Sequence, residues 1–159
     1  MRTLVVYYSR TGNTQFVAEK IAEHLGAETC EVIEKKKRKG RLGFLTSGYA
    51  AIRKKLTDIE VSKPIDNYDL IIIGSPVWAD KITPAIRTFI TKNDFSGKKL
   101  ACFVTLDGDK PEKTLENLKE ALQPRTPLGE LGITGALKNR EKSEQQIMEW
   151  CQKIQKQIE

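Results

Sequence analysis

The chain has 159 residues, with 27 Lys and Arg against 21 Asp and Glu and a formal net charge of +6. This length fits a single domain covering residues 1–159, and so moderate a charge excludes no class of partner. Every apolar run is too short to span a bilayer or to form a signal-peptide core, so we expect a soluble cytoplasmic protein with no membrane partner.

Strand and helix patterns alternate along the chain. Continuous apolar runs, typical of strands buried on both faces, occupy residues 3–9, 69–75 and 99–106. Two weaker strand patterns lie at residues 28–34, interpreted as an edge strand, and at residues 128–134.

Helical patterns separate these strands. The first stops at Gly26, and the second has apolar residues at helical spacing between positions 45 and 56. Thr83 is a candidate N-cap followed by a proline, Pro111 opens a further helix, and Ser143 starts a capping-box arrangement for the last one.

Five strand–helix units in series predict a doubly wound α/β fold, with a five-stranded parallel sheet covered by helices on both faces. In such sheets ligands bind beyond the carboxyl ends of the strands, where the winding direction reverses. The loops after residues 3–9, 69–75 and 99–106 should therefore lie on one rim and form parts of one site.

Small polar residues fill the first loop, which runs directly into a helix. Exposed N–H groups at a helix start bind anions, and hydroxyl groups add hydrogen bonds to several oxygens of one anion. The loop has neither the lysine of a Walker A motif nor the three glycines of a dinucleotide fingerprint. It therefore suits a phosphate monoester, although an ordinary strand-to-helix turn stays an alternative; its residues are Ser9, Arg10, Thr11, Gly12, Asn13 and Thr14.

This loop resembles the phosphate loop of the flavodoxin family, [ST]-x-T-G-x-T, at Ser9, Thr11, Gly12 and Thr14. The resemblance implies a flavodoxin-like strand order of 2-1-3-4-5 and binding of the FMN phosphate by this loop. Arg10 stands at a free position of the motif, where it either adds charge to the phosphate site or points to solvent.

The second loop places an aromatic residue on the same rim. By resemblance it covers the isoalloxazine ring of FMN, and its residues are Pro76, Val77, Trp78 and Ala79. An indole offers a flat face to a flat ligand. The alternative is that Trp78 packs on Ile82 as part of the core.

The third loop is polar, and the resemblance implies that its N–H groups bind the pyrimidine end of the ring. Its residues are Thr105, Leu106, Asp107, Gly108 and Asp109. Many flavodoxins have a stacking tyrosine here and this chain has none, so Leu106 either covers that face of the ring or leaves it open. The alternative for Asp109 is a solvated turn before the helix that follows.

A cluster of cations, Lys35 to Lys39 and Arg41, follows residues 28–34. It either steers an acidic redox partner to this rim or forms a solvated loop. Nucleic-acid binding is disfavoured because no aromatic residues are interleaved with the cations.

Cysteine and histidine usage limits the other chemistry. Cys30, Cys102 and Cys151 form no CxxC pair, and we expect the first two to be buried. His24 is the only histidine, so we expect no histidine metal centre, no other metal site and no catalytic triad.

Together with these observations, the resemblance to flavodoxins implies an FMN-binding electron carrier without catalytic side chains. A small FMN-dependent NAD(P)H:quinone-type reductase is the alternative, and a phosphate-binding interaction module without redox function is the second. The carrier is favoured over a stand-alone reductase because nothing in the chain resembles a second nucleotide site.

Overall fold

The structure is a computed structural model that describes residues 1–35, 56–108 and 110–159. Three expectations lie outside this part of the chain. They are the helical pattern between residues 45 and 56 (apart from its last residue), the cations from Lys36 to Arg41, and Asp109.

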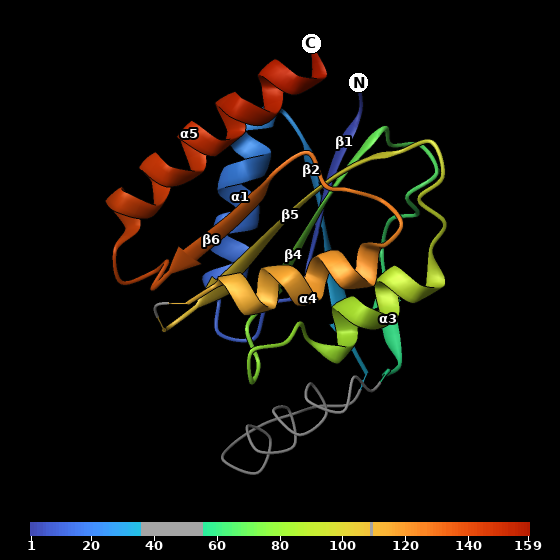
Figure 1. Ribbon diagram of the computed structural model, residues 1–159, viewed down its shortest axis with the longest axis horizontal. Coiled ribbons are helices and arrows are strands. Elements are labelled where there is room, and N and C mark those ends of the chain that lie inside the picture. The colour runs from blue at the N-terminus through green and yellow to red at the C-terminus, as the bar shows by residue number, and fades with distance from the viewer. Residues whose placement is uncertain (36–55, 109) are drawn as a thin grey trace.

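A six-stranded sheet forms the centre of the molecule, in the order β3-β2-β1-β4-β5-β6 (Figure 1). Neighbouring strands from β2 to β6 run parallel in this order, as expected for a 2-1-3-4-5 arrangement. Their bounds are β1, Thr3–Tyr7; β2, Glu28–Glu34; β4, Leu70–Pro76; β5, Lys99–Leu106; and β6, Glu130–Thr134.

The sixth strand was not expected. β3, Ile59–Val61, pairs antiparallel with β2 and covers its outer edge, so β2 is not the edge strand that its weak alternation suggested. Three residues, two of them exposed, are too few to produce a strand pattern in the sequence.

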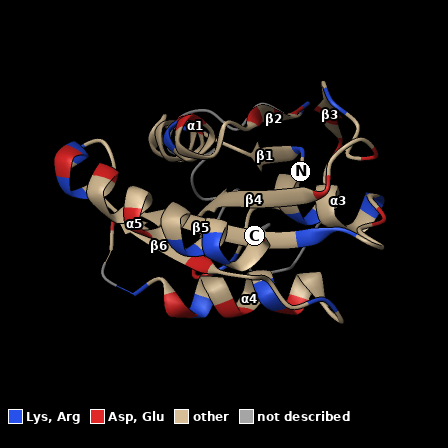
Figure 2. Ribbon diagram, turned by 90° about the horizontal axis from the view of Figure 1, so that it is seen from above, with Lys and Arg blue, Asp and Glu red and all other residues tan. Residues whose placement is uncertain are grey.

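Helices cover both faces of the sheet (Figures 1 and 2). α1, Asn13–Leu25, and α5, Arg140–Ile158, pack on one face; α3, Pro84–Lys92, and α4, Glu112–Leu122, pack on the other. Strand residues point alternately into the two cores. Val5 and Ile72 face α1 and α5, whereas Val6 and Ile73 face α3 and α4.

The N-cap predicted for α3 is confirmed, whereas the one predicted for α5 is wrong. Thr83 is the N-cap of α3, and its hydroxyl accepts a hydrogen bond from Ile86 N at 3.4 Å. Ser143 does not cap α5, because a turn at residues 135–139 lets the helix begin at Arg140 and leaves Ser143 buried in its first turn. Among the described helices, none is long and apolar enough to cross a membrane.

Candidate functional site

Three loops meet at the carboxyl ends of β1, β4 and β5, and a cavity of about 300 Å³ lies between them. All of its lining residues in the described part of the chain belong to the site predicted from the sequence: Arg10, Thr11, Asn13, Pro76, Val77, Trp78, Thr105, Leu106 and Asp107. The other predicted residues described by the structure, Ser9, Gly12, Thr14, Ala79 and Gly108, lie in the same loops but do not line the cavity.

The first loop presents N–H groups at the start of α1. Gly12 is the N-cap with φ of 91°, a backbone conformation that side-chain-bearing residues rarely adopt. Ser9 Oγ accepts hydrogen bonds from Gly12 N and Gln15 N, both at 3.2 Å. The N–H groups of Asn13 and Thr14 belong to the first turn, so no acceptor within the helix is available to them.

A pair of buried hydroxyl groups joins the first loop to the third. Thr14 Oγ1 lies 2.7 Å from Thr105 Oγ1, and the two residues are 1% and 2% exposed. Their mutual hydrogen bond uses the hydrogen of one hydroxyl and leaves the other hydrogen for a further acceptor. A second contact between loops, from Val77 N to Thr105 O at 2.9 Å, ties the second loop to the third.

Trp78 is both a core residue and part of the cavity wall. Its side chain is 9% exposed and meets the ring of Tyr8 edge to face, with the ring centroids 5.5 Å apart. The guanidinium carbon of Arg10 lies 5.9 Å from the centroid of the Trp78 ring. Arg10 therefore contacts the indole and lines the cavity, instead of extending into bulk solvent.

The chain makes a tight turn immediately after Trp78. Trp78 and Lys81 exchange two backbone hydrogen bonds of 3.0 Å, and between them Ala79 and Asp80 have φ of 49° and 58°. Two consecutive positive φ values define the mirror-image turn that usually contains Asn-Gly.

The turn at residues 135–139, after β6, buttresses the first and third loops and was missed in the sequence. Leu137 N donates to Asn13 Oδ1 at 3.1 Å, and Lys138 Nζ lies 3.7 Å from Asp107 Oδ1. In addition, Thr134 Oγ1 donates to the carbonyl of Gly108 at 3.0 Å. The strand pattern at residues 128–134 could have revealed this turn. A strand parallel to β5 must end on the same rim, so the segment after it lies there too.

The cavity has a mixed electrostatic character. Arg10 supplies a cation and Asp107 an anion that Lys138 partly offsets. No group of three or more His, Cys, Asp or Glu side chains in the described part of the chain is arranged to hold a metal ion. The site can therefore bind a ligand with an anionic end and a flat end through hydroxyl, backbone and aromatic groups.

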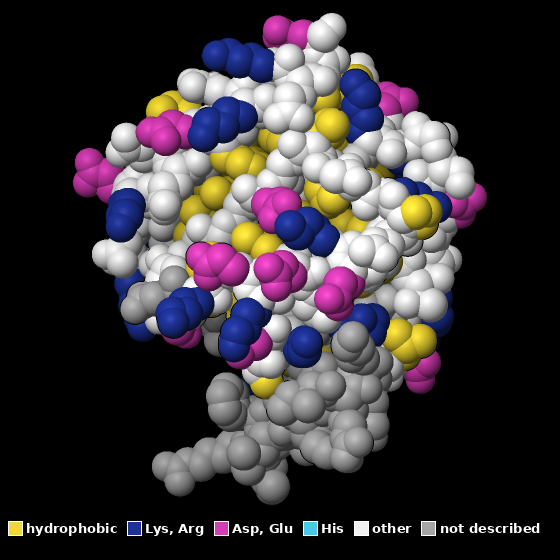
Figure 3. Space-filling view, viewed as in Figure 1, with side chains coloured by type: hydrophobic (Ala, Val, Ile, Leu, Met, Phe, Trp, Pro, Cys, Tyr) yellow, Lys and Arg dark blue, Asp and Glu magenta, His cyan; other side chains and the backbone are white. Residues whose placement is uncertain are grey.

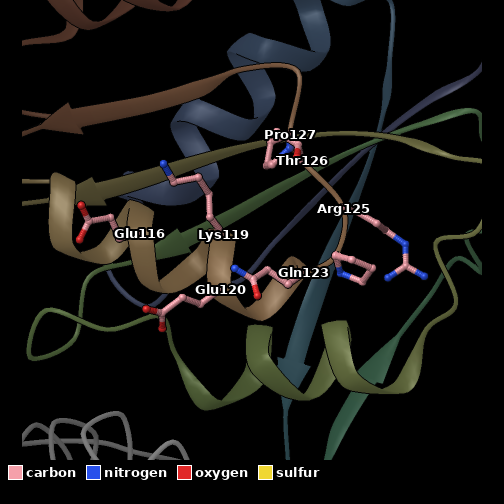
Figure 4. A pocket seen from close by; sticks show the side chains of 8 residues that line it. Glu116, Lys119, Glu120, Gln123, Arg125, Thr126 and Pro127 are labelled. Atoms are coloured by element: carbon pink, nitrogen blue, oxygen red, sulfur yellow. The ribbon is translucent and has the colours of Figure 1, made fainter.

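A second cavity, of about 550 Å³, lies along the C-terminal half of α4 and the segment that follows it (Figure 4). It contains none of the predicted site residues. Its walls are formed by charged and amide side chains, one threonine and two prolines: Glu116, Lys119, Glu120, Gln123, Pro124, Arg125, Thr126 and Pro127.

Comparison with known proteins gives one family. The family model described as flavodoxin matches residues 2–154. An NAD(P)H dehydrogenase (quinone) from Archaeoglobus fulgidus is 30% identical over 102 residues, 61% of this chain and 52% of that protein. A flavodoxin from Maridesulfovibrio salexigens is 26% identical over 114 residues, 68% of this chain and 65% of that protein. These matches span between half and two thirds of the length of the two curated relatives.

Solved structures have the same fold. A flavoprotein from Lactobacillus acidophilus in complex with FMN aligns with a TM-score of 0.74 and 24% identity, covering 86% of this chain and 95% of that one. Oxidised flavodoxin 2 from Bacillus cereus aligns with a TM-score of 0.61 and 18% identity, covering 99% of each chain.

Proposed function

The chain belongs to the flavodoxin family, and on this premise we propose that it binds FMN in the three-loop cavity and carries electrons between partner proteins. The observation that carries the proposal is that every described residue lining the cavity belongs to one of the three predicted loops, at the ends of β1, β4 and β5. The similar flavoprotein that contains FMN supports the choice of cofactor.

The phosphate would be held at the start of α1. The N–H groups of Asn13 and Thr14 and the hydroxyl group of Thr11 are the donors at this end of the cavity. Neutral donors at a helix start suit a phosphate monoester because they stabilise its charge at close range. Arg10, from the same loop, adds one positive charge to the wall.

The flavin ring would lie between the second and third loops. Trp78 offers an aromatic surface, and the segments around Val77 and Leu106 offer backbone groups. When bound, FMN supplies one-electron and two-electron redox chemistry, while these residues hold it, orient it and exclude water from it.

An absorption spectrum of the purified protein tests the proposal. We expect a yellow protein with flavin bands, or a colourless one that gains them on addition of FMN. A protein that stays colourless and takes up no FMN would rule out both the carrier and the reductase.

The alternative is a reductase, favoured by one observation: the 30% identity to an NAD(P)H dehydrogenase (quinone). The FMN-loaded protein separates the two functions when it is mixed with NADPH and a soluble quinone. A carrier leaves the NADPH absorbance unchanged without a partner enzyme, whereas sustained NADPH oxidation by the protein alone identifies a reductase.

We also propose that an acidic redox protein docks near Lys35–Arg41. Residues 36–55 contain eight Lys or Arg and no Asp or Glu, so the rest of the chain holds 19 cations against 21 anions. On the face seen in Figure 3, acidic and basic side chains of the described residues are interspersed.

Opposite charges raise the rate of encounter, so exchanging Lys36, Lys37 and Lys39 for Glu should slow electron transfer to an acidic partner and remove its salt dependence. An unchanged rate at low salt would exclude this surface.

We infer a cytoplasmic location from the cysteines. Cys30, Cys102 and Cys151 are all free and buried, which suits a reducing compartment.

A further inference from the structure

Asn117, on α4, lies behind the turn that follows Trp78. Its side chain is 2% exposed, and its Oδ1 accepts two hydrogen bonds. One comes from Ile82 N at 3.1 Å and the other from Arg87 Nη2 at 2.9 Å. Ile82 directly follows the turn, so this amide joins α4 to the point where the turn ends.

The turn itself is strained. Ala79 and Asp80 have φ of 49° and 58°, and neither is glycine or asparagine. Left-handed backbone costs about 1–2 kcal/mol for a residue with a side chain, and it persists only where the surroundings hold it. The surroundings must therefore fix the turn at both ends.

Buried polar groups supply this restraint. At the entry, Val77 N donates to Thr105 O at 2.9 Å. After the exit, Thr83 N donates to Ser75 Oγ at 3.1 Å. Directly at the end of the turn, Asn117 Oδ1 accepts a hydrogen bond from Ile82 N.

The contact between the turn and α4 includes open space. A cavity of about 310 Å³ separates them; it is lined by Ala79, Asp80, Lys81, Lys113, Glu116, Asn117 and Glu120. Asp80 and Lys113 form an ion pair at 3.8 Å, but both side chains are exposed, and such pairs contribute little. Asn117 thus provides a buried hydrogen bond between this helix and the end of the turn.

We propose that Asn117 is a positioning residue for the flavin: it fixes the turn that carries Trp78 and so sets how the second loop meets the ring. The inference rests on FMN binding in the three-loop cavity. Asn117 is not among the residues that line this cavity, and it acts through Ile82 and the turn.

The unpaired groups beside Asn117 provide a matched pair of variants. Asn117 Nδ2 and Arg87 Nε are buried donors, and no described residue accepts from them. Burial lowers the pKa of Arg87, and the charge of Glu120 opposes that shift. Figure 4 shows Glu120 on α4, with α3, which carries Arg87, alongside.

Asn117→Asp keeps the acceptor for Ile82 N and replaces an unpaired donor with an oxygen. Arginine binds a carboxylate through two parallel hydrogen bonds, and Arg87 has both Nη2 and Nε available for this. Asn117→Leu keeps the branched shape of the side chain but has no acceptor. The two variants therefore differ in the hydrogen bond that the proposal requires.

The first test uses the protein without flavin. Amide hydrogen exchange at Ile82, followed by NMR, should be slow in the wild type and in Asn117→Asp. In Asn117→Leu it should become at least about tenfold faster, while exchange at β1 is unchanged. Equal exchange at Ile82 in all three proteins would overturn the proposal, whether or not the protein binds FMN.

The second test uses FMN and riboflavin. Asn117→Leu should weaken both by the same factor, about threefold to tenfold, and shift the midpoint potential of bound FMN, because the ring and not the phosphate is affected. Asn117→Asp should have the flavin affinity and the midpoint potential of the wild type. If Asn117→Leu leaves both at wild-type values, the positioning role is wrong; if the wild type binds no flavin, the proposed function fails, and the exchange experiment still decides whether Asn117 holds the turn.

Discussion

At the scale of single residues, hydroxyl groups hold the first loop of the candidate site together and join it to the third. Ser9 Oγ satisfies two N–H groups of the first loop, and Thr14 pairs with Thr105 across to the third. The groups that these hydrogen bonds connect take no part in strand pairing. The geometry of the phosphate end therefore depends on a few small polar side chains.

Gly12→Ala should weaken FMN binding about tenfold or more. A side chain at φ of 91° costs about 1–2 kcal/mol, and relief of that strain would move the N–H groups at the start of α1. Gly26→Ala is the matched control, since Gly26 has φ of 59° at the other end of the same helix. Fluorescence titration with FMN measures both; similar losses of affinity in the two variants would contradict the role of the first loop.

Thr105→Val should lower the affinity for FMN more than the affinity for riboflavin. It leaves the buried Thr14 hydroxyl without its partner, which costs about 1–3 kcal/mol, and so disturbs the phosphate end. Thr105→Ser keeps the hydroxyl and should behave like the wild type. Equal losses for FMN and riboflavin in Thr105→Val would show that Thr105 acts on the ring instead.

The sequence contains the residues of the site but not their partners. Ser9, Thr11, Gly12 and Thr14 follow a recognisable spacing, and parallel strands place the three loops on one rim. The same reasoning could have placed the turn that contains Leu137 on this rim, but not its hydrogen bond with Asn13, 124 positions away. Asn117 could not be found in this way, because its contact with Ile82 crosses 35 positions of the chain.

At the scale of elements, the close packing of β4 on β5 brings the second and third loops together. Gly74, in β4, lies directly against the ring of Phe103 in β5. A Cβ at this position would overlap the ring. This contact lies just before the ends of both strands, where the loops begin.

Gly74→Ala should lower the free energy of unfolding by about 1–3 kcal/mol, as overpacking in a core does. Gly108→Ala is the control, because a Cβ at Gly108 meets no atom within 4 Å. Urea denaturation measures both. Combining Gly74→Ala with Phe103→Leu should cost less than the sum of the single changes; strict additivity would show that the overlap is not the cause.

The predictability of the elements follows their length and burial. β1, β4 and β5 are almost wholly buried, so their apolar runs predict them directly. β3 has three residues and is fixed by pairing with β2, which local sequence does not encode. The start of α5 depends on the turn at residues 135–139, whereas the pattern at Ser143 indicated a later start.

At the scale of the whole molecule, buried acidic groups make stability sensitive to high pH. Burial raises the pKa of Cys102 and of Cys151 to about 12, and it raises the pKa of Tyr7 to about 12 with help from Glu31. These groups ionise at lower pH in the unfolded chain than in the folded one. Their contribution is therefore complete at neutral pH and is lost as the pH rises toward about 12.

The free energy of unfolding should consequently fall between about pH 8 and about pH 10.5, by up to about 2 kcal/mol for each buried thiol. Urea denaturation at the two pH values measures the fall. Cys102→Ala should reduce the fall, whatever its effect at neutral pH. A fall that is equally steep in this variant would contradict the assignment to Cys102.

FMN binding between the three loops is tested most directly by an NMR titration of the ¹⁵N-labelled protein. FMN should shift the amide resonances of residues 9–14, 77–81 and 105–108 with one-to-one stoichiometry. Riboflavin should shift the second and third groups but affect residues 11–14 much less. An absence of shifts, or shifts confined to the cavity around Gln123 and Arg125, would contradict the account.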